Sequence, residues 1–102
     1  GQEFEEAGYK GSWKAGKREG EGCITWADGS TFTGSWKNDM RQEGEMRFQN
    51  GNTYIGSFKD DKMNGKGRLL LTTGIIFEGE FKNGYCDSMG RLLYPSGDIY
   101  QG

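Results

Sequence analysis

The chain has 102 residues and a formal net charge of −2, and its 15 acidic and 13 basic side chains are spread over both halves. This balance excludes the concentrated basic surface of a nucleic-acid-binding protein, and the sequence lacks the apolar run of about 18 residues that predicts a membrane span. Nineteen glycines together with 14% aromatic residues indicate a folded and periodic chain, because disordered segments are poor in aromatics.

The chain divides into a short leading segment and a repeat array. Residues 1–8 are acidic and outside the repeating pattern, and we expect them to act as a cap or to be mobile. From residue 9 onward an aromatic-x-Gly-x-aromatic motif recurs, so residues 9–102 are predicted to form tandem repeats. The copies begin at Tyr9, Phe32, Tyr54 and Phe77, with spacings of 23, 22 and 23 residues, and a partial fifth copy begins 23 residues later at Tyr100. The start at Gly1 instead of Met is expected of a fragment or a processed chain.

Each repeat is predicted to be a β-hairpin, because both of its halves alternate with a period of two. The two aromatics of the motif share one face with the glycine between them, and Gly22, Ile24 and Trp26 share that face in the second half of the first repeat. Residues 15–20 are expected to form a longer loop at one end of the hairpin. Two-residue type I′ turns are predicted at the other end, at Asp28-Gly29, Asn50-Gly51, Thr73-Gly74 and Ser96-Gly97. The expected fold is all-β, a single elongated and twisted antiparallel sheet in which four repeats cover ~38 Å at ~4.8 Å per strand.

The apolar positions of the hairpins collect on one face of the predicted sheet. One interpretation is that this aromatic stripe is the core of the protein, partly covered by the curl of the sheet. The other is that its rings line an open groove, because the sequence predicts no helix or second sheet to cover them, and large apolar patches mark partner sites. The residues predicted to bind a partner are Tyr9, Trp13, Trp26, Phe32, Trp36, Phe48, Tyr54, Phe58, Phe77, Phe81, Tyr94 and Tyr100.

A lysine follows the second aromatic of every complete motif. One interpretation of this ladder is a solvated edge that discourages pairing with other chains. The alternative is a surface for acidic groups of a partner or of lipid headgroups, to which basic residues in the loops would add. The residues of this alternative lipid site are Lys14, Lys17, Arg18, Lys37, Arg41, Lys59, Lys62, Lys66 and Lys82.

The sequence predicts no catalytic residue, metal site or cofactor. It contains no histidine, the commonest general base and metal ligand. Its glycines lack the Lys-Ser/Thr step that completes a phosphate-binding loop, and its paired carboxylates alternate along strands without a pocket to desolvate them. Cys23 and Cys86 occupy different positions in their repeats, which argues against a disulfide framework and for a reducing, cytoplasmic setting.

The repeat resembles that of the MORN family, named for membrane occupation and recognition nexus. The first copy matches this pattern best, at Tyr9, Gly11, Trp13, Gly16, Gly20, Gly22, Trp26 and Gly29. Departures are Asp39, Asp61 and Ser88 at glycine positions, and Gln42 near another in a copy that is one residue shorter. These departures concern the geometry of the loops, whereas the hairpin frame is kept.

The resemblance implies a non-catalytic, protein-binding scaffold in a cytoskeletal, ciliary or membrane-contact structure, with any enzyme domain outside this chain. The expected partner is an amphipathic helix or extended segment in the groove, or a neighbouring subunit that continues the sheet beyond Tyr100. The alternative function is binding to acidic phospholipids, phosphoinositides among them. We expect neither nucleic acid nor a transmembrane segment.

Overall fold

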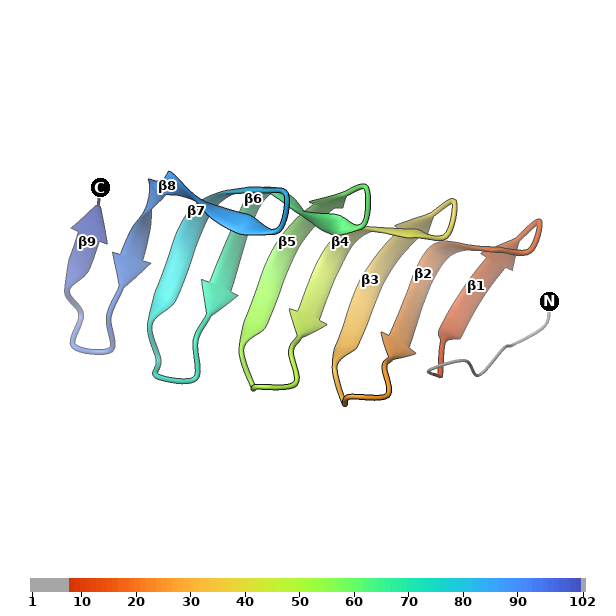
Figure 1. Ribbon diagram of the computed structural model, residues 1–102, viewed down its shortest axis with the longest axis horizontal. Coiled ribbons are helices and arrows are strands. Elements are labelled where there is room, and N and C mark those ends of the chain that lie inside the picture. Colours follow the sequence, from red (N-terminus) through yellow and green to blue (C-terminus); the bar gives the residue numbers. More distant parts are fainter. Residues whose placement is uncertain (1–7, 102) are drawn as a thin grey trace.

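The computed structural model describes residues 8–101, apart from the side chains of residues 87–89, and over this range the chain forms one antiparallel sheet without helices (Figure 1). The predicted fold class is therefore confirmed, while the expectations for residues 1–7 lie outside the described residues. The strands are β1 (Lys10–Lys14), β2 (Lys17–Thr25), β3 (Thr31–Lys37), β4 (Met40–Arg47), β5 (Thr53–Lys59), β6 (Lys62–Leu70), β7 (Ile76–Lys82), β8 (Tyr85–Leu93) and β9 (Ile99–Gln101). Every strand pairs with its neighbours in sequence, and the partial fifth repeat supplies β9.

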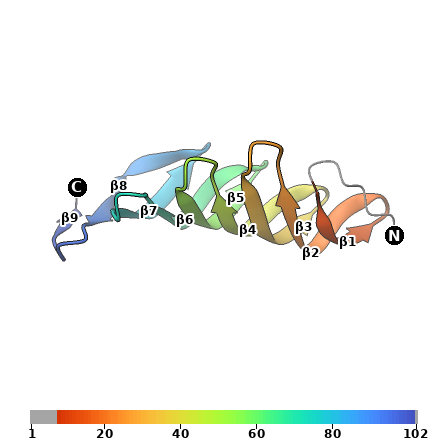
Figure 2. The same cartoon turned by 90° about the horizontal axis from the view of Figure 1, so that it is seen from below.

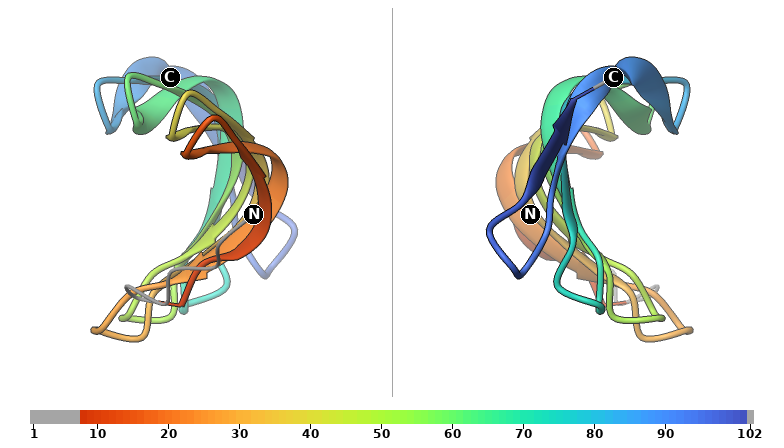
Figure 3. Two further views of the ribbon diagram at one scale, coloured as in Figure 1. Left: turned by 90° about the vertical axis from the view of Figure 1, so that its right-hand side faces the viewer. Right: turned by 90° about the vertical axis from the view of Figure 1, so that its left-hand side faces the viewer.

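The sheet is a ribbon that curls into a trough. Its Cα trace extends over 48 × 22 × 17 Å, and successive hairpins stand side by side along the long axis (Figure 2). Seen along that axis, the cross-section is C-shaped, because both rows of hairpin ends bend toward the same side (Figure 3). The sheet therefore has one concave face, here called the trough, and one convex face.

The turns differ from those predicted. The hairpin ends after the second aromatic are two-residue turns, with Lys14 pairing with Lys17 in the first. Both central residues are left-handed in each, with φ of 53° and 79° at Ala15 and Gly16, which is the type I′ arrangement that matches strand twist. The loop expected at residues 15–20 is thus wrong, because β2 already begins at Lys17. The corresponding turns are Asn38-Asp39, Asp60-Asp61 and Asn83-Gly84.

The Asp-Gly end of the hairpin is a three-residue loop instead of the predicted two-residue type I′ turn. The Gly29 N–H donates to the Trp26 carbonyl at 3.0 Å, and the Trp26 N–H donates to the Ser30 carbonyl at 2.8 Å. Only the glycine of this loop has a positive φ, 96°. The Asp28 carboxylate instead accepts a hydrogen bond from the Ser30 N–H at 2.8 Å, and this bond keeps Asp28 out of the left-handed region that a type I′ turn requires.

A continuous row of glycines lies beneath the aromatic rings. Gly34 faces Gly44 within its hairpin and Gly22 in the preceding one, and the later repeats have equivalent pairs. A Cβ atom on Gly67 would lie 2.6 Å from the ring of Tyr54. The opening aromatic of each repeat thus folds flat over backbone, as the small–large alternation predicts, and the glycines allow this close approach.

The rings form one edge-to-face chain along the ribbon. Tyr9 contacts Trp36 with a centroid separation of 5.5 Å, and Tyr54 contacts Phe81 at 4.7 Å, in each case joining one hairpin to the next. Each such pair contributes on the order of 0.5–1.5 kcal/mol beyond its buried area. The buried core is Tyr9, Ile24, Phe32, Trp36, Met46, Tyr54, Phe58 and Phe81. This single sheet therefore builds its core on its own concave face.

Candidate functional site

The twelve aromatics predicted to bind a partner fall into three groups. Tyr9, Phe32, Trp36, Tyr54, Phe58 and Phe81 are buried, and Phe32 and Tyr54 have 0% of their surface exposed. Trp13, Trp26, Phe48 and Phe77 are half-buried against that core. Tyr94 and Tyr100 are exposed, at 37% and 63%. The buried group is occupied by the packing of the sheet. A partner can reach the half-buried group with Leu69 and Met63, and the two exposed tyrosines near the C-terminal end of the sheet; Met63 was not among the residues predicted from the sequence.

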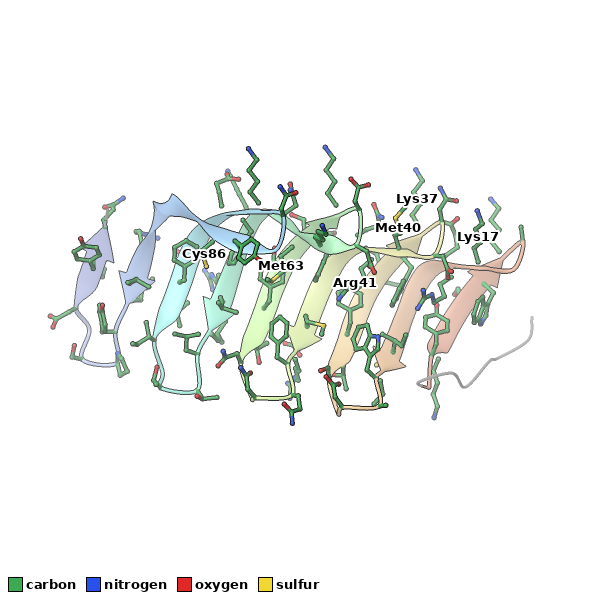
Figure 4. All side chains as sticks on the ribbon, in the orientation of Figure 1. Lys17, Lys37, Met40, Arg41, Met63 and Cys86 are labelled. Atoms are coloured by element: carbon green, nitrogen blue, oxygen red, sulfur yellow. The ribbon has the colours of Figure 1, made fainter. Side chains whose placement is uncertain are left out.

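Two arginines lie in the trough instead of standing free at its edge. The guanidinium carbon of Arg18 lies 4.4 Å from the ring centroid of Trp36, and that of Arg41 lies 4.7 Å from that of Phe58. Figure 4 shows Arg41 on the near face of the sheet, the side toward which the hairpin ends curl in Figure 3. Both arginines were assigned to the alternative lipid site, but their charged groups stack on rings of the core.

Each of these arginines also pairs with an aspartate in the turn of the next hairpin. Arg18 Nε lies 2.6 Å from Asp39 Oδ1, and Arg41 Nε lies 2.7 Å from Asp61 Oδ1. Each guanidinium also donates to the backbone carbonyl of the same aspartate. These Arg–Asp locks explain two departures from the glycine pattern, since an aspartate tolerates the left-handed φ of 71° or 63° while holding the preceding repeat.

The first lock carries a pH-dependent prediction. Hydrogen bonding from Arg18 holds the pKa of Asp39 below its ordinary value, so the ion pair stabilises the fold above the unfolded-state pKa and is lost as the pH falls through the folded value. Replacing Asp39 by Asn keeps the turn but removes the charge, and should lower the free energy of unfolding at pH 7 by about 0.2–1 kcal/mol, the range of exposed pairs. Urea unfolding should show this difference shrinking in acid; an undiminished difference would contradict the assignment.

Six lysines lie along one edge of the trough. They flank the type I′ turns, and all are exposed: Lys14, Lys17, Lys37, Lys59, Lys62 and Lys82. Lys17 and Lys37 are labelled at this edge in Figure 4. Asp39 and Asp61 of the same turns are engaged by arginines, and the exposed Asp60 offsets part of the charge, so the six lysines leave this lysine rim basic. The opposite edge, formed by the three-residue loops, carries Asp28 and Asp98.

The convex face has a different character. An open hollow of about 540 Å³ lies there around Ile55, which is 42% exposed. Glu78 in its wall pairs with Arg68 at 2.8 Å and with Arg91, and the hydrogen bond from Arg91 is the main reason that the pKa of Glu78 is lowered. Lys66, which was placed in the alternative lipid site, is on this face opposite Glu80. The charges of this face largely cancel one another.

The described residues contain no cluster of three His, Cys, Asp or Glu side chains that could hold a metal ion. Cys23 and Cys86 are both free thiols. Within residues 8–101, no helix has the length and hydropathy needed to cross a bilayer. What the geometry offers is therefore an apolar concave surface with one basic edge.

The described residues form a sheet of tandem hairpins, and in each hairpin an aromatic side chain packs over a pair of facing glycines. This architecture defines a β-hairpin repeat protein. The chain belongs to the MORN repeat family, whose model matches residues 9–31, 32–53, 54–75 and 77–99. The resemblance of the sequence is thereby confirmed. MORN repeats are non-catalytic modules that typically serve in protein or membrane interaction.

The chain is also similar to alsin from rat, mouse and human. Each is 33% identical over 70 residues, which cover 63% of this chain. The match spans only 4% of the length of these relatives. The similarity therefore concerns the repeats and not the whole of those proteins.

Proposed function

We propose that this chain is a protein-binding scaffold module whose trough receives an amphipathic helix or an extended segment of a partner, within a cytoskeletal or ciliary assembly. The observation that carries the proposal is the open apolar floor of the trough, formed by Trp26, Phe48, Met63 and Phe77. No element among the described residues covers this floor. Uncovered apolar surfaces of this kind are typical of partner sites.

The packing beneath the floor favours binding by a preformed surface. The half-buried rings rest on the edge-to-face chain, as Phe77 does on Phe81 with centroids 5.4 Å apart. The Arg–Asp locks tie neighbouring hairpins to one another at the rim. A surface held in this way loses little conformational entropy when a partner docks, which leaves more of the contact energy for affinity.

A second candidate function, binding to acidic phospholipids, is favoured by the lysine rim. Each basic residue near an anionic surface gains about 1 kcal/mol of attraction, and six lysines share one edge. Arg18, Arg41 and Lys66 do not join them, because the two arginines are stacked in the trough and Lys66 is on the convex face. The lipid candidate therefore rests on the rim alone.

The two candidates can be separated by paired variants. Trp26→Ser with Phe48→Ser strips the trough floor, and Ile55→Ser is the matched control on the convex face. We expect a partner purified by affinity capture to bind the control as it binds the parent chain, and the trough variant at least tenfold more weakly, with both variants folded by circular dichroism.

Vesicles supply the second arm of this experiment. In sedimentation with vesicles containing phosphatidylserine or phosphoinositide, Lys14→Glu with Lys37→Glu and Lys59→Glu removes half of the lysine rim. Binding that disappears in this variant but survives in the trough variant would favour the lipid candidate. Equal partner binding by the trough variant and the parent chain would refute the trough assignment.

A further inference from the structure

The junction between the third and fourth repeats departs from the two before it. At the first two junctions an arginine and an aspartate form the locks described above. At the third, the equivalent positions hold Met63 and Gly84, which are joined by a backbone hydrogen bond from the Gly84 N–H to the Met63 carbonyl at 2.9 Å. At this junction the sequence thus has an uncharged methionine in place of the arginine and a glycine in place of the aspartate.

A hollow opens into the trough at this junction. It has a volume of about 170 Å³, extends from the second lock to the third junction, and is lined by Arg41, Met46, Phe48, Phe58, Asp61, Lys62, Met63 and Gly84. We call it the Met63 pocket; Met63 is labelled on the near face in Figure 4. Its apolar walls are two rings and two thioethers, and Lys62 of the lysine rim also borders it. The charges of Arg41 and Asp61 are already paired with each other, and the Arg41 guanidinium also stacks on the ring of Phe58. Such walls accept an apolar side chain, because thioethers adapt to irregular apolar shapes.

The repeat spacing indicates the conformation of the occupant. Successive hairpins are two strands apart, or about 9.6 Å, and seven residues of an α-helix rise about 10.5 Å and return to nearly the same face. Three residues of a β-strand cover about 10 Å, but their side chains alternate between faces, so successive repeats would meet opposite sides of the strand. A β-strand is therefore a poor match, whereas an α-helix along the trough can present the same face to every repeat, as can a polyproline II segment with about 9.3 Å per three-residue turn.

The lysine rim indicates the charge of that helix. Lys14, Lys37, Lys59 and Lys82 recur once per hairpin on one edge, with the same spacing of about 9.6 Å. Acidic residues seven positions apart on the helix would face successive lysines, while its apolar stripe faces the floor. The opposite edge, with Asp28 and Asp98, would meet a neutral or basic side of the helix.

We propose that the occupant of the trough is an α-helix with heptad-spaced acidic residues along the edge facing the lysine rim, anchored by one apolar side chain in the Met63 pocket. This inference rests on the proposed function, because it names the partner of the same surface. It also assigns a role to the missing third lock, since an arginine and an aspartate at this junction would close the pocket that the anchor enters.

The pocket can be closed without replacing any of the buried core residues, because Met63 is only partly buried. Met63→Arg with Gly84→Asp installs at the third junction the pair found at the first two. Gly84 has a φ of 88°, near the 71° and 63° of Asp39 and Asp61, and a Cβ there meets nothing within 4 Å. We therefore expect this variant to melt at or above the temperature of the parent chain, so that a loss of binding cannot be ascribed to unfolding.

The probe is a displayed library of 21-residue peptides randomised at every position, selected on the whole chain. We expect selected peptides to carry an apolar stripe with Glu or Asp at seven-residue spacing, and the synthesised peptide to bind the closed-pocket variant at least tenfold more weakly. Lys59→Glu with Lys62→Glu should weaken it by a similar factor and reduce its salt dependence. Ile55→Arg, a charge on the convex face, is the control and should leave binding unchanged.

The outcomes separate the inference from the function on which it rests. Peptides that need Trp26 and Phe48 but bind the closed-pocket variant unchanged would overturn the pocket while the trough proposal stands. A selection dominated by proline at every third position, the polyproline II period, would overturn the helix. If every selected peptide bound independently of the trough residues, the proposed function would fail together with the inference, and rim-dependent binding to anionic vesicles would then support the lipid candidate.

Discussion

Replacement of Gly34 by alanine is expected to lower the free energy of unfolding by about 3 kcal/mol or more, the upper part of the range for overpacked sites. A Cβ atom there would lie 2.7 Å from the Cα of Gly44 and 2.9 Å from the tip of the Phe32 ring, and would also meet the Glu43 carbonyl oxygen. Two of these neighbours are backbone atoms of the paired strand, which cannot move without opening the ladder. The sheet must therefore separate at this pair or displace a fully buried ring.

The neighbouring substitution Ser35→Ala is the matched control. Ser35 is in the same strand but on the convex face, where its hydroxyl makes a long hydrogen bond of 3.4 Å to the Glu43 carbonyl, and its loss should change stability by about 0.5 kcal/mol or less. Urea unfolding of the two variants and the parent chain measures both effects. Equal stabilities for Gly34→Ala and Ser35→Ala would show that the glycine row is not required by close approach.

The sequence predicts the strands, their order and their buried face because those features are periodic. An alternation of two sets the faces, and an aromatic two positions before a glycine predicts that a ring covers backbone, as Tyr54 covers Gly67. The type I′ turns were predicted at the wrong end of each hairpin, because the preference of Asp-Gly pairs for such turns takes no account of the hydrogen bonds that the aspartate side chain makes. Asp28 bonds to the backbone of Ser30, whereas Asp60-Asp61, a less typical pair, adopts the left-handed turn.

The Arg–Asp locks could have been predicted from the sequence, although these arginines were first interpreted as independent charges. Arg18 precedes Asp39, and Arg41 precedes Asp61, at equivalent places in consecutive repeats, while Met63 is followed at that place by Gly84. An arginine and an aspartate that appear and disappear together indicate contact. The burial of Trp36, Phe58 and Phe81 was not predictable in the same way, because it depends on how tightly the sheet curls around its own rings.

The curl of the sheet buries Tyr54 completely. Its side chain is 0% exposed, its ring contacts Phe58 and Phe81 at centroid distances of 5.3 and 4.7 Å, and its hydroxyl donates to the Ser57 carbonyl at 2.7 Å. Tyr54→Ala should lower the free energy of unfolding by about 4 kcal/mol, as for other large aromatics truncated in cores. A chain of this length has on the order of 5–15 kcal/mol in total, so the variant should be close to unfolded at physiological temperature.

Tyr54→Phe separates the ring from the hydroxyl. It keeps the packing and should cost only about 1 kcal/mol at pH 7, the net value of one hydrogen bond. Burial raises the pKa of Tyr54 to about 12, above the value of about 10 in an unfolded chain. Its hydroxyl therefore favours the folded state fully below pH 10, and this contribution is lost as the pH rises from 10 toward 12.

The parent chain and Tyr54→Phe should consequently lose stability at different rates in alkali. Between about pH 10 and pH 12 the parent loses the contribution of Tyr54, whereas the phenylalanine variant has no proton to release there and should become the more stable of the two. Tyr9, whose pKa burial also raises, is present in both proteins and cancels in the comparison. Denaturant unfolding at stepped pH measures the difference, and parallel stability curves through this range would show that Tyr54 ionises as freely in the folded sheet as in the unfolded chain.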